Sequence, residues 1–268
     1  MKVVAVVCVR NEEEVIGKML LSLVTQTMVP EKIVIVNDGS TDDTGLKLSM
    51  WEDVYHKRIV VINRDDRVGG ENLAGTPEMA EAFNIAFEYV EKQEYEYDYL
   101  MVCGADDEYP ATYIEDLIGC MKQDDLIVVA SGRKSKWKTS PSGSGRLITR
   151  KWWLEYGQRY AYPSYYWESK CIMVAAMKGY KTVLFHDIEF NTRSQGSVYG
   201  HYRYGVNHRS INYRLLTVLK YISVLVLSFQ WRGCVQYIIG YCKRPKRIIS
   251  EDRQFSKEYL KWRRKRKK

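Results

Sequence analysis

The first 130 residues alternate between two kinds of hydrophobic pattern. Short apolar runs rich in Val, Ile and Ala are typical of strands buried on both faces of a parallel sheet; they cover residues 2–9, 32–36, 58–62, 99–102 and 126–130. Between them, apolar residues recur at helical spacing, which predicts helices at residues 15–25, 43–55, 77–91 and 112–122. Thr76 and residues 41–43 are candidate N-caps. The alternation predicts an α/β fold built on a mostly parallel, Rossmann-type sheet flanked by helices.

The pattern is less regular after residue 130. Residues 134–150 are rich in Ser, Gly and basic side chains, which predicts a loop of the length of an active-site lid. An aromatic helical region follows at residues 151–167, then a helix at residues 168–178 and a short strand at residues 181–185.

The segment at residues 214–242 is apolar but interrupted. Lys220, Gln230, Arg232 and Gln236 divide it into pieces of about ten residues, whereas a transmembrane helix needs about 20 consecutive apolar residues. We therefore predict amphipathic helices that lie in a membrane interface rather than a membrane span.

The positive charge is concentrated at the C-terminus. Of the 41 basic and 33 acidic residues in the chain, residues 243–268 hold 13 and 3, which leaves 28 against 30 elsewhere. A basic tail beside an apolar segment favours an anionic membrane surface as partner and no nucleic acid, although a nucleic-acid-binding tail or a localisation signal stays an alternative. We expect three parts: an α/β domain at residues 1–193, an amphipathic helical segment at 194–242 and a basic tail at 243–268.

The six cysteines show no CxxC pair and no tight spacing, which indicates reduced thiols, typical of a cytosolic protein. The N-terminus enters the first strand directly, so no signal peptide is expected. Together with the basic tail, these features predict a cytoplasmic protein that is peripheral at the inner face of the cell membrane.

Polar segments follow three of the predicted strands. The first strand ends in CVRNEEEV, the second in VNDGSTDDT and the fourth in VCGADDEYP. In open α/β sheets, ligands bind beyond the carboxyl ends of the strands, so we expect these segments to meet at one site.

The first two of these motifs resemble the opening motifs of glycosyltransferase family 2, and the similarity runs from Lys2 to about Phe190. The resemblance implies a GT-A fold and an inverting transfer of sugar from a nucleotide-sugar donor. It implies that the Asp38 carboxylate accepts a hydrogen bond from the nucleobase, whereas Asn37 departs from the acid usual at that position. The nucleotide-binding residues it implies are Val9, Arg10, Glu12, Asp38, Arg67, Ala105 and Asp106. Alternatively, residues 37–44 form only a turn and N-cap, and Glu12–Glu14 are acids that favour a helix N-terminus.

Asp106 and Asp107 are adjacent carboxylates after a buried strand, the type of hard oxygen ligand that Mn²⁺ or Mg²⁺ prefers. The family usually has Asp-x-Asp at this place, and here Gly104 stands at the first Asp. We expect Asp106 to be the metal ligand, with Asp107 as a helper. The alternative is an acidic loop without a metal.

The family also places a catalytic acid at the start of a helix that ends in a Gly-Tyr turn. In YYWESKCIMVAAMKGYKTVLF this position falls on Glu168, eleven residues before Gly179, and it implies a general base that deprotonates the acceptor hydroxyl. Alternatively, Glu168 is only a first-turn helix acid. Arg133 and Arg146 are candidates for contact with the diphosphate or an anionic acceptor, or are simply solvated.

These features predict an inverting, metal-dependent glycosyltransferase that acts on a membrane-associated acceptor, such as a polyprenyl phosphate, a lipid-linked glycan or a surface polysaccharide. Two alternatives stay open. A sugar-phosphate nucleotidyltransferase would have a Gly-rich pyrophosphate loop where this chain has CVRNEEE. A non-catalytic nucleotide-sugar-binding or lipid-binding protein is the other. Asn84 is expected to support the site structurally, and His186 and Arg193 are weaker donor-contact candidates.

Overall fold

The computed structural model describes residues 1–70, 72–73, 76–134, 140–164, 166–193, 197–210, 215–227, 229–242 and 250–266. The chain forms two compact units. The larger comprises Met1–Ala74, Glu78–Tyr162 and Trp167–Arg193, and the smaller comprises Gly75–Pro77, Pro163–Tyr166 and Ser194–Lys268.

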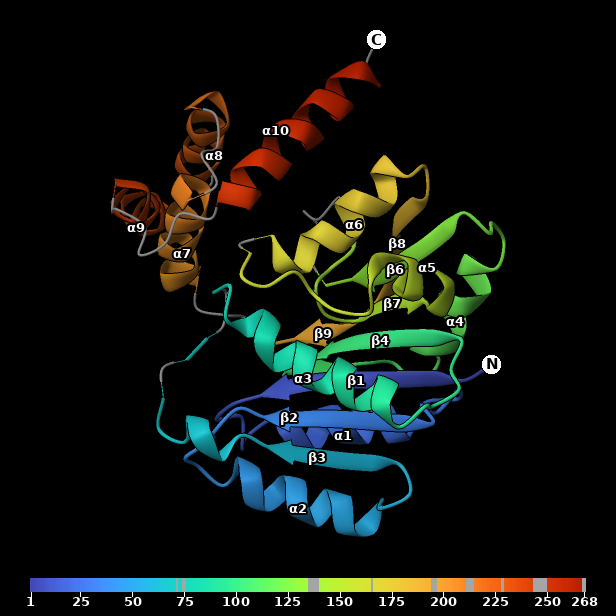
Figure 1. Ribbon diagram of the computed structural model, residues 1–268. Coiled ribbons are helices and arrows are strands. Elements are labelled where there is room, and N and C mark those ends of the chain that lie inside the picture. Colours follow the sequence, from blue (N-terminus) through green and yellow to red (C-terminus); the bar gives the residue numbers. More distant parts are fainter. Residues whose placement is uncertain are drawn as a thin grey trace. The chain divides into compact units, whose positions relative to one another are not determined.

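A seven-stranded sheet forms the centre of the larger unit, in the order β3-β2-β1-β4-β7-β6-β8. Figure 1 shows β4, β1, β2 and β3 side by side. All neighbouring pairs are parallel except the two that involve β7, so the sheet is mixed and mostly parallel. The strands are β1 (Val3–Val9), β2 (Lys32–Asn37), β3 (Ile59–Asn63), β4 (Tyr99–Gly104), β6 (Ile127–Arg133), β7 (Arg146–Thr149) and β8 (Lys181–Glu189).

Both faces of this sheet are covered by helices, which explains the unbroken apolar runs. All seven residues of β1 are buried. Val3, Ala5, Val7 and Val9 pack on the face covered by α1 (Ile16–Val24), α2 (Thr44–Val54) and α4 (Tyr113–Met121). The alternate residues pack on the face covered by α3 (Met79–Lys92), α5 (Arg150–Tyr156) and α6 (Trp167–Met177). The period of two along a strand thus places each side chain in one of two cores.

Three predictions from the sequence are wrong in detail. Residues 146–149, predicted as part of a loop, form β7 in the middle of the sheet. The aromatic region is not one helix, because α5 ends at Tyr156 and Gly157 follows in the left-handed conformation that commonly ends helices. Thr76 does not cap α3, which begins at Met79 with Glu78 at the N-cap.

The C-terminal part of the smaller unit consists of α7 (Ser197–Ser210), α8 (Leu215–Leu227), α9 (Trp231–Cys242) and α10 (Ser250–Lys265). α7 and α9 pack backbone to backbone: a Cβ on Gly205 would lie 2.2 Å from the Tyr237 carbonyl oxygen, and one on Gly240 would lie 2.1 Å from that of Tyr202. Only glycine allows this approach. Within the described residues, no helix is long and apolar enough to cross a membrane.

The first half of α10 packs against the segment Pro163–Tyr166, which belongs to the same unit. The Ser164 hydroxyl donates a hydrogen bond of 2.6 Å to the buried Asp252 carboxylate, and the rings of Tyr166 and Phe255 pack edge to face. The basic end of the chain is helical over Ser250–Lys265, and these contacts hold the first half of that helix. All six cysteines are free thiols, and Cys8 and Cys103 lie in strands as predicted.

Candidate active site

The sheet register brings the predicted polar segments together. Val9 at the end of β1 pairs with Asn37 at the end of β2, and Cys8 pairs with Gly104 at the end of β4. The chain therefore leaves three adjacent strands at the same edge of the sheet. Arg10, Asp38 and Ala105 are the first residues beyond these ends, so the segments named from the sequence do form one site.

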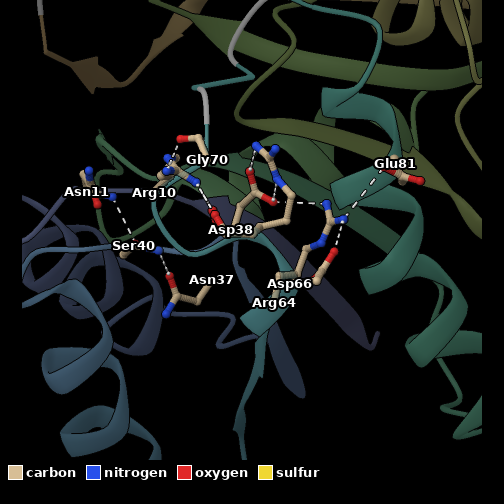
Figure 2. A network of polar contacts seen from close by, with 10 residues as sticks. Arg10, Asn11, Asn37, Asp38, Ser40, Arg64, Asp66, Gly70 and Glu81 are labelled. Atoms are coloured by element: carbon tan, nitrogen blue, oxygen red, sulfur yellow. Dashed lines mark hydrogen bonds and ion pairs between the residues drawn. The ribbon is translucent and has the colours of Figure 1, made fainter.

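Arg10 ties this edge together through its guanidinium group (Figure 2). It donates hydrogen bonds to the backbone carbonyls of Asp38, Arg67 and Gly70, which lie 28, 57 and 60 residues away in the chain. The Arg10 side chain thus holds the loop after β2 and the loop after β3 to the end of β1. Val9 contributes through its backbone, because its carbonyl accepts a hydrogen bond of 2.9 Å from the Asp38 amide.

The Asp38 carboxylate is buried between two arginines, as Figure 2 shows for Arg64. Arg64 Nη1 lies 3.1 Å from Oδ1, and Arg67 Nη2 lies 3.4 Å from Oδ2. An ionised carboxylate offers about four acceptor positions, so it can still accept a ring N–H of a nucleobase. Gly39 makes this arrangement possible: its φ is +72°, and a Cβ there would lie 2.3 Å from the Arg67 carbonyl oxygen.

The structure also gives a reason for Asn37 in place of the usual acid. Asn37 Nδ2 donates a hydrogen bond of 2.9 Å to Asn63 Oδ1, while its Oδ1 accepts one of 3.2 Å from the Ser40 amide. An amide at position 37 thus donates to the neighbouring strand end and accepts from the turn that follows its own strand. The departure from the family pattern thus belongs to a local hydrogen-bond network.

Glu12 and Asp106 both contact the segment that follows β8, a connection that the sequence did not indicate. Arg193 Nη2 lies 2.7 Å from Glu12 Oε2, and the Thr192 hydroxyl donates a hydrogen bond of 3.1 Å to Asp106 Oδ2. Burial raises the pKa of Glu12, against the opposing effect of Arg193 and with a further upward contribution from Asp106. The pairing of β9 (Asn191–Thr192) with β5 (Asp107–Glu108) holds this segment in place.

The adjacent carboxylates of Asp106 and Asp107 differ in burial and in hydrogen bonding. Asp107 is buried, and its carboxylate accepts hydrogen bonds from the Gly104 amide, the Tyr109 hydroxyl and the Ser144 hydroxyl. Burial raises the pKa of Asp107, while the bonds from Tyr109 and Gly104 oppose that shift. Asp106 is only half-buried, with Thr192 on one oxygen.

The carboxylates of Asp106 and Asp107 fit a divalent cation only if substrate oxygens complete its coordination. Mg²⁺-type sites are commonly held by one or two carboxylates together with substrate phosphates. Asp106 can supply such a carboxylate, whereas the oxygens of Asp107 already face three protein donors. No cluster of three or more His, Cys, Asp or Glu side chains with metal-binding geometry occurs in the described ranges. Substrate oxygens would therefore have to complete the coordination.

A short turn at residues 141–145 connects these acids with Glu168. Ser144 contacts Asp107, and a Cβ on the neighbouring Gly143 would lie 0.9 Å from Glu168 Oε1. The Glu168 carboxyl group thus occupies the space that a side chain at position 143 would fill. Tyr113 supports the turn, since its hydroxyl donates a hydrogen bond of 2.6 Å to the Gly145 carbonyl.

Arg146 lies inside this arrangement rather than in a loop. It is 1% exposed at the start of β7, where Nε donates to the Ser142 carbonyl and Nη1 to the Glu168 carbonyl, each at 2.8 Å. Its charge thus holds the backbone of the turn and of α6. Arg133, at the end of β6, pairs with Glu189.

The other candidates are placed as follows. The Asn84 amide group clamps the backbone of Tyr160, with hydrogen bonds of 3.0 and 2.7 Å, which is a structural contact. Ala105 is 9% exposed and packs in the core beneath the site. His186 is exposed on β8.

Solved structures with the same fold include glycosyltransferases. Mannosyltransferase PcManGT from Pyrobaculum calidifontis, in complex with GDP-Man and Mn²⁺, matches 78% of this chain with a TM-score of 0.62 and 17% identity. The chain spans 62% of that protein. The structure of S. aureus TarS 1-349 in complex with UDP matches with a TM-score of 0.52 and 14% identity, over 90% of each chain. The structure of the same protein in complex with UDP-GlcNAc matches with a TM-score of 0.52 and 12% identity, over 96% of this chain and 92% of that chain.

No sequence among the curated proteins matches the chain. The model of the family described as glycosyl transferase family 2 matches residues 4–188, which is more than half of the chain. This match favours a glycosyltransferase over the alternative of a sugar-phosphate nucleotidyltransferase. The protein therefore belongs to glycosyl transferase family 2, the nucleotide-sugar-dependent glycosyltransferases, and has a GT-A-like fold.

Proposed function

We propose that the protein is an inverting, metal-dependent glycosyltransferase that transfers a sugar from a nucleoside-diphosphate sugar to a membrane-associated acceptor. The observation that supports this proposal best is the turn at residues 141–145, because it brings the Glu168 carboxyl group next to the segment that contacts Asp107. The proposed general base, Glu168, therefore lies near the segment that carries Asp106, the proposed metal ligand.

The nucleoside of the donor lies at the ends of β1 and β2 in this proposal. Asp38 accepts a hydrogen bond from the base, and Arg64 and Arg67 orient that carboxylate. Val9, Arg10, Glu12 and Ala105 shape the surrounding loops. GDP-Man and UDP-GlcNAc are bound by the matched structures, so both nucleotide types are suitable first probes.

Asp106 would hold Mn²⁺ or Mg²⁺, which supplies positive charge for the departing diphosphate. Glu168 accepts the proton of the acceptor hydroxyl as its oxygen forms a bond to the anomeric carbon. The bond from that carbon to the phosphate oxygen breaks, and its electron pair leaves with the diphosphate. Attack from the opposite side inverts the configuration. Arg133, which is half-buried and pairs with Glu189, is the candidate for contact with an anionic acceptor, whereas Arg146 acts by holding the turn.

The apolar helices α8 and α9 and the basic α10 support an acceptor at an anionic membrane, such as a polyprenyl phosphate, a lipid-linked glycan or a surface polysaccharide. We propose the inner face of the cell membrane as the place of action, and residues 1–193, 194–242 and 243–268 as the functional parts.

The test is a panel of nucleotide-sugars in a thermal-shift assay with and without Mn²⁺, because a ligand that binds the folded state raises its apparent stability. The ligand that binds is then assayed for Mn²⁺-dependent release of its nucleoside diphosphate. We expect both binding and release. Binding without any release would support the non-catalytic alternative, and no binding at all would refute the proposal.

A further inference from the structure

The connection between α8 and α9 displays an arrangement that is unfavourable in water. Phe229 lies two positions after Leu227, the last residue of α8; its φ is +55°, in the left-handed region, and its side chain is 83% exposed. Its amide donates to the Val226 carbonyl, and the Gln230 amide donates to the Leu225 carbonyl. These two bonds are those of a Schellman motif, whose left-handed position is usually glycine.

A bulky residue with positive φ is a backbone outlier, and an exposed phenyl ring adds the unfavourable hydration of apolar surface. Three other non-glycine residues in the described ranges have positive φ, and all three are polar: Asn11, Glu94 and Gln158. Backbone geometry alone therefore does not account for Phe229. A strained position that carries an unfavourable side chain indicates a functional role for that side chain.

The neighbouring side chains extend the same surface. Leu227, the last residue of α8, is 78% exposed, and Trp231, the first of α9, is 57% exposed. Further exposed apolar residues continue along both helices: Leu219, Val224, Val235, Ile238 and Ile239. The opposite faces of the same helices are buried with Val218, Leu225, Cys234 and Tyr237 as their core.

Both helices thus expose large apolar side chains in addition to those that they bury. A cluster of exposed apolar side chains normally contacts an apolar medium or a partner. At 13 and 12 residues, α8 and α9 are shorter than the about 20 residues that a span requires. The medium that fits two short helices joined by an aromatic turn is the outer few ångströms of a lipid bilayer, where Trp is favoured.

Charge complementarity indicates an anionic bilayer rather than a second protein. Lys220 on α8 and Arg232 on α9 are exposed beside the apolar residues, and the last turn of α10 carries Arg263, Arg264 and Lys265. Basic residues near such a surface attract anionic headgroups. The rigid backbone packing of α7 on α9 at Gly205 and Gly240 would keep the turn in position while it inserts.

We propose that Leu227, Phe229 and Trp231, named here the α8–α9 tip, insert into an anionic bilayer and hold the enzyme at the membrane surface. This inference rests on the membrane-associated acceptor in the proposed function and specifies the element that reaches the membrane. Vesicle binding and nucleotide binding are separate measurements, so failure of one is distinguishable from failure of the other.

The decisive variant is Phe229→Gly in the full chain. It relieves the left-handed backbone, so thermal stability is expected to be equal or higher, while binding to equimolar phosphatidylcholine–phosphatidylglycerol vesicles falls about tenfold or more from the loss of one buried aromatic side chain. Glu94→Gly is the matched control: it relieves the same kind of backbone, at φ of +51°, without removing apolar surface. It is expected to keep vesicle binding unchanged.

A second pair tests the tip without any backbone effect. Leu227→Ser and Val54→Ser each remove an exposed aliphatic side chain, 78% and 72% exposed, from the last position of a helix. Only Leu227→Ser is expected to weaken vesicle binding. Equal vesicle affinity of wild type, Phe229→Gly and Leu227→Ser would overturn the proposal. So would a concentration-dependent oligomer, seen by sedimentation without lipid, that Phe229→Gly converts to monomer, because the tip would then bind a second copy.

Discussion

Gly143→Ala tests the assignment of Glu168 more selectively than a change of Glu168 itself. The added methyl carbon would lie 0.9 Å from Glu168 Oε1, 2.1 Å from Cδ and 2.9 Å from Oε2, so the carboxyl group cannot stay where it is. The backbone at position 143 is not in the left-handed region, so alanine is acceptable there. The substitution therefore acts mainly by moving one carboxyl group.

The expected magnitudes differ strongly between folding and catalysis. The displaced group is the end of a flexible side chain, and turning it to a less favourable rotamer costs about 0.5–1.5 kcal/mol of stability. A positioned general base contributes about 10² or more to the rate. Gly143→Ala is thus expected to lower kcat at least about 10²-fold, with nearly normal donor affinity and a small loss of stability in chemical denaturation.

The assay is steady-state turnover of the donor found in the ligand panel, together with calorimetric donor affinity. Gly119→Ala in α4 is the control, because no atom lies within 4 Å of its added methyl group, and normal kcat is expected. In the double variant Gly143→Ala/Glu168→Gln, the second change is expected to add little, since the base has already been displaced. Normal kcat in Gly143→Ala, or independent losses in the double variant, would refute the role of Glu168.

Three further predictions concern single side chains. Asp106→Ala is expected to abolish Mn²⁺-dependent affinity for nucleoside diphosphate in calorimetry; unchanged affinity would exclude Asp106 as the ligand. Asp107→Ala leaves three donors without their acceptor and is expected to cost about 2–4 kcal/mol in chemical denaturation; a loss of only a few tenths would contradict that role. Burial lowers the pKa of His208 from 6.5 to about 4, so the unfolded chain binds a proton first as pH falls. His208 therefore does not reduce the free energy of unfolding above pH 6.5, but that free energy falls by up to about 3 kcal/mol as the pH is lowered toward 4. His208→Gln is expected to remove this pH dependence when unfolding is measured at a series of pH values.

Much of the fold was predictable because each strand of the parallel half is a continuous apolar run. Residues 2–9 and 99–102 cannot be buried on one face only, so their strand character was clear from composition alone. β7 was not predictable in the same way. It has only four residues and begins with a charged residue, Arg146. The buried Arg146 guanidinium donates to the carbonyl of Ser142, in the preceding turn, and to that of Glu168, 22 residues later in the chain.

The site was predictable where it depends on strand ends and unpredictable where it depends on long-range pairing. Asp38 and Asp106 follow buried strands, and this placed them at the carboxyl edge. The pair of Glu12 and Arg193 joins residues 181 positions apart, which no local pattern indicates. The difference between Asp106 and Asp107 depends on which of two adjacent side chains turns inward, toward Tyr109 and Gly104, and a sequence motif does not contain that direction.

The position of β7 has a consequence for how the enzyme becomes active during folding. Strands β1 to β4 pair directly with one another, and this half of the sheet holds Asp38 and Arg10. The turn at residues 141–145 reaches the same edge only after β7 has inserted between β4 and β6 and closed a loop from Gly104. The β4–β7 pairing joins Tyr99 to Thr149, 50 residues apart, whereas β1 pairs with β4 from Val3 to Tyr99, 96 residues apart. Because a longer loop costs more closure entropy, the β1–β4 pairing is expected to form more slowly than the β4–β7 pairing. A refolding chain would therefore regain nucleotide affinity and turnover together, once β1 has paired with β4.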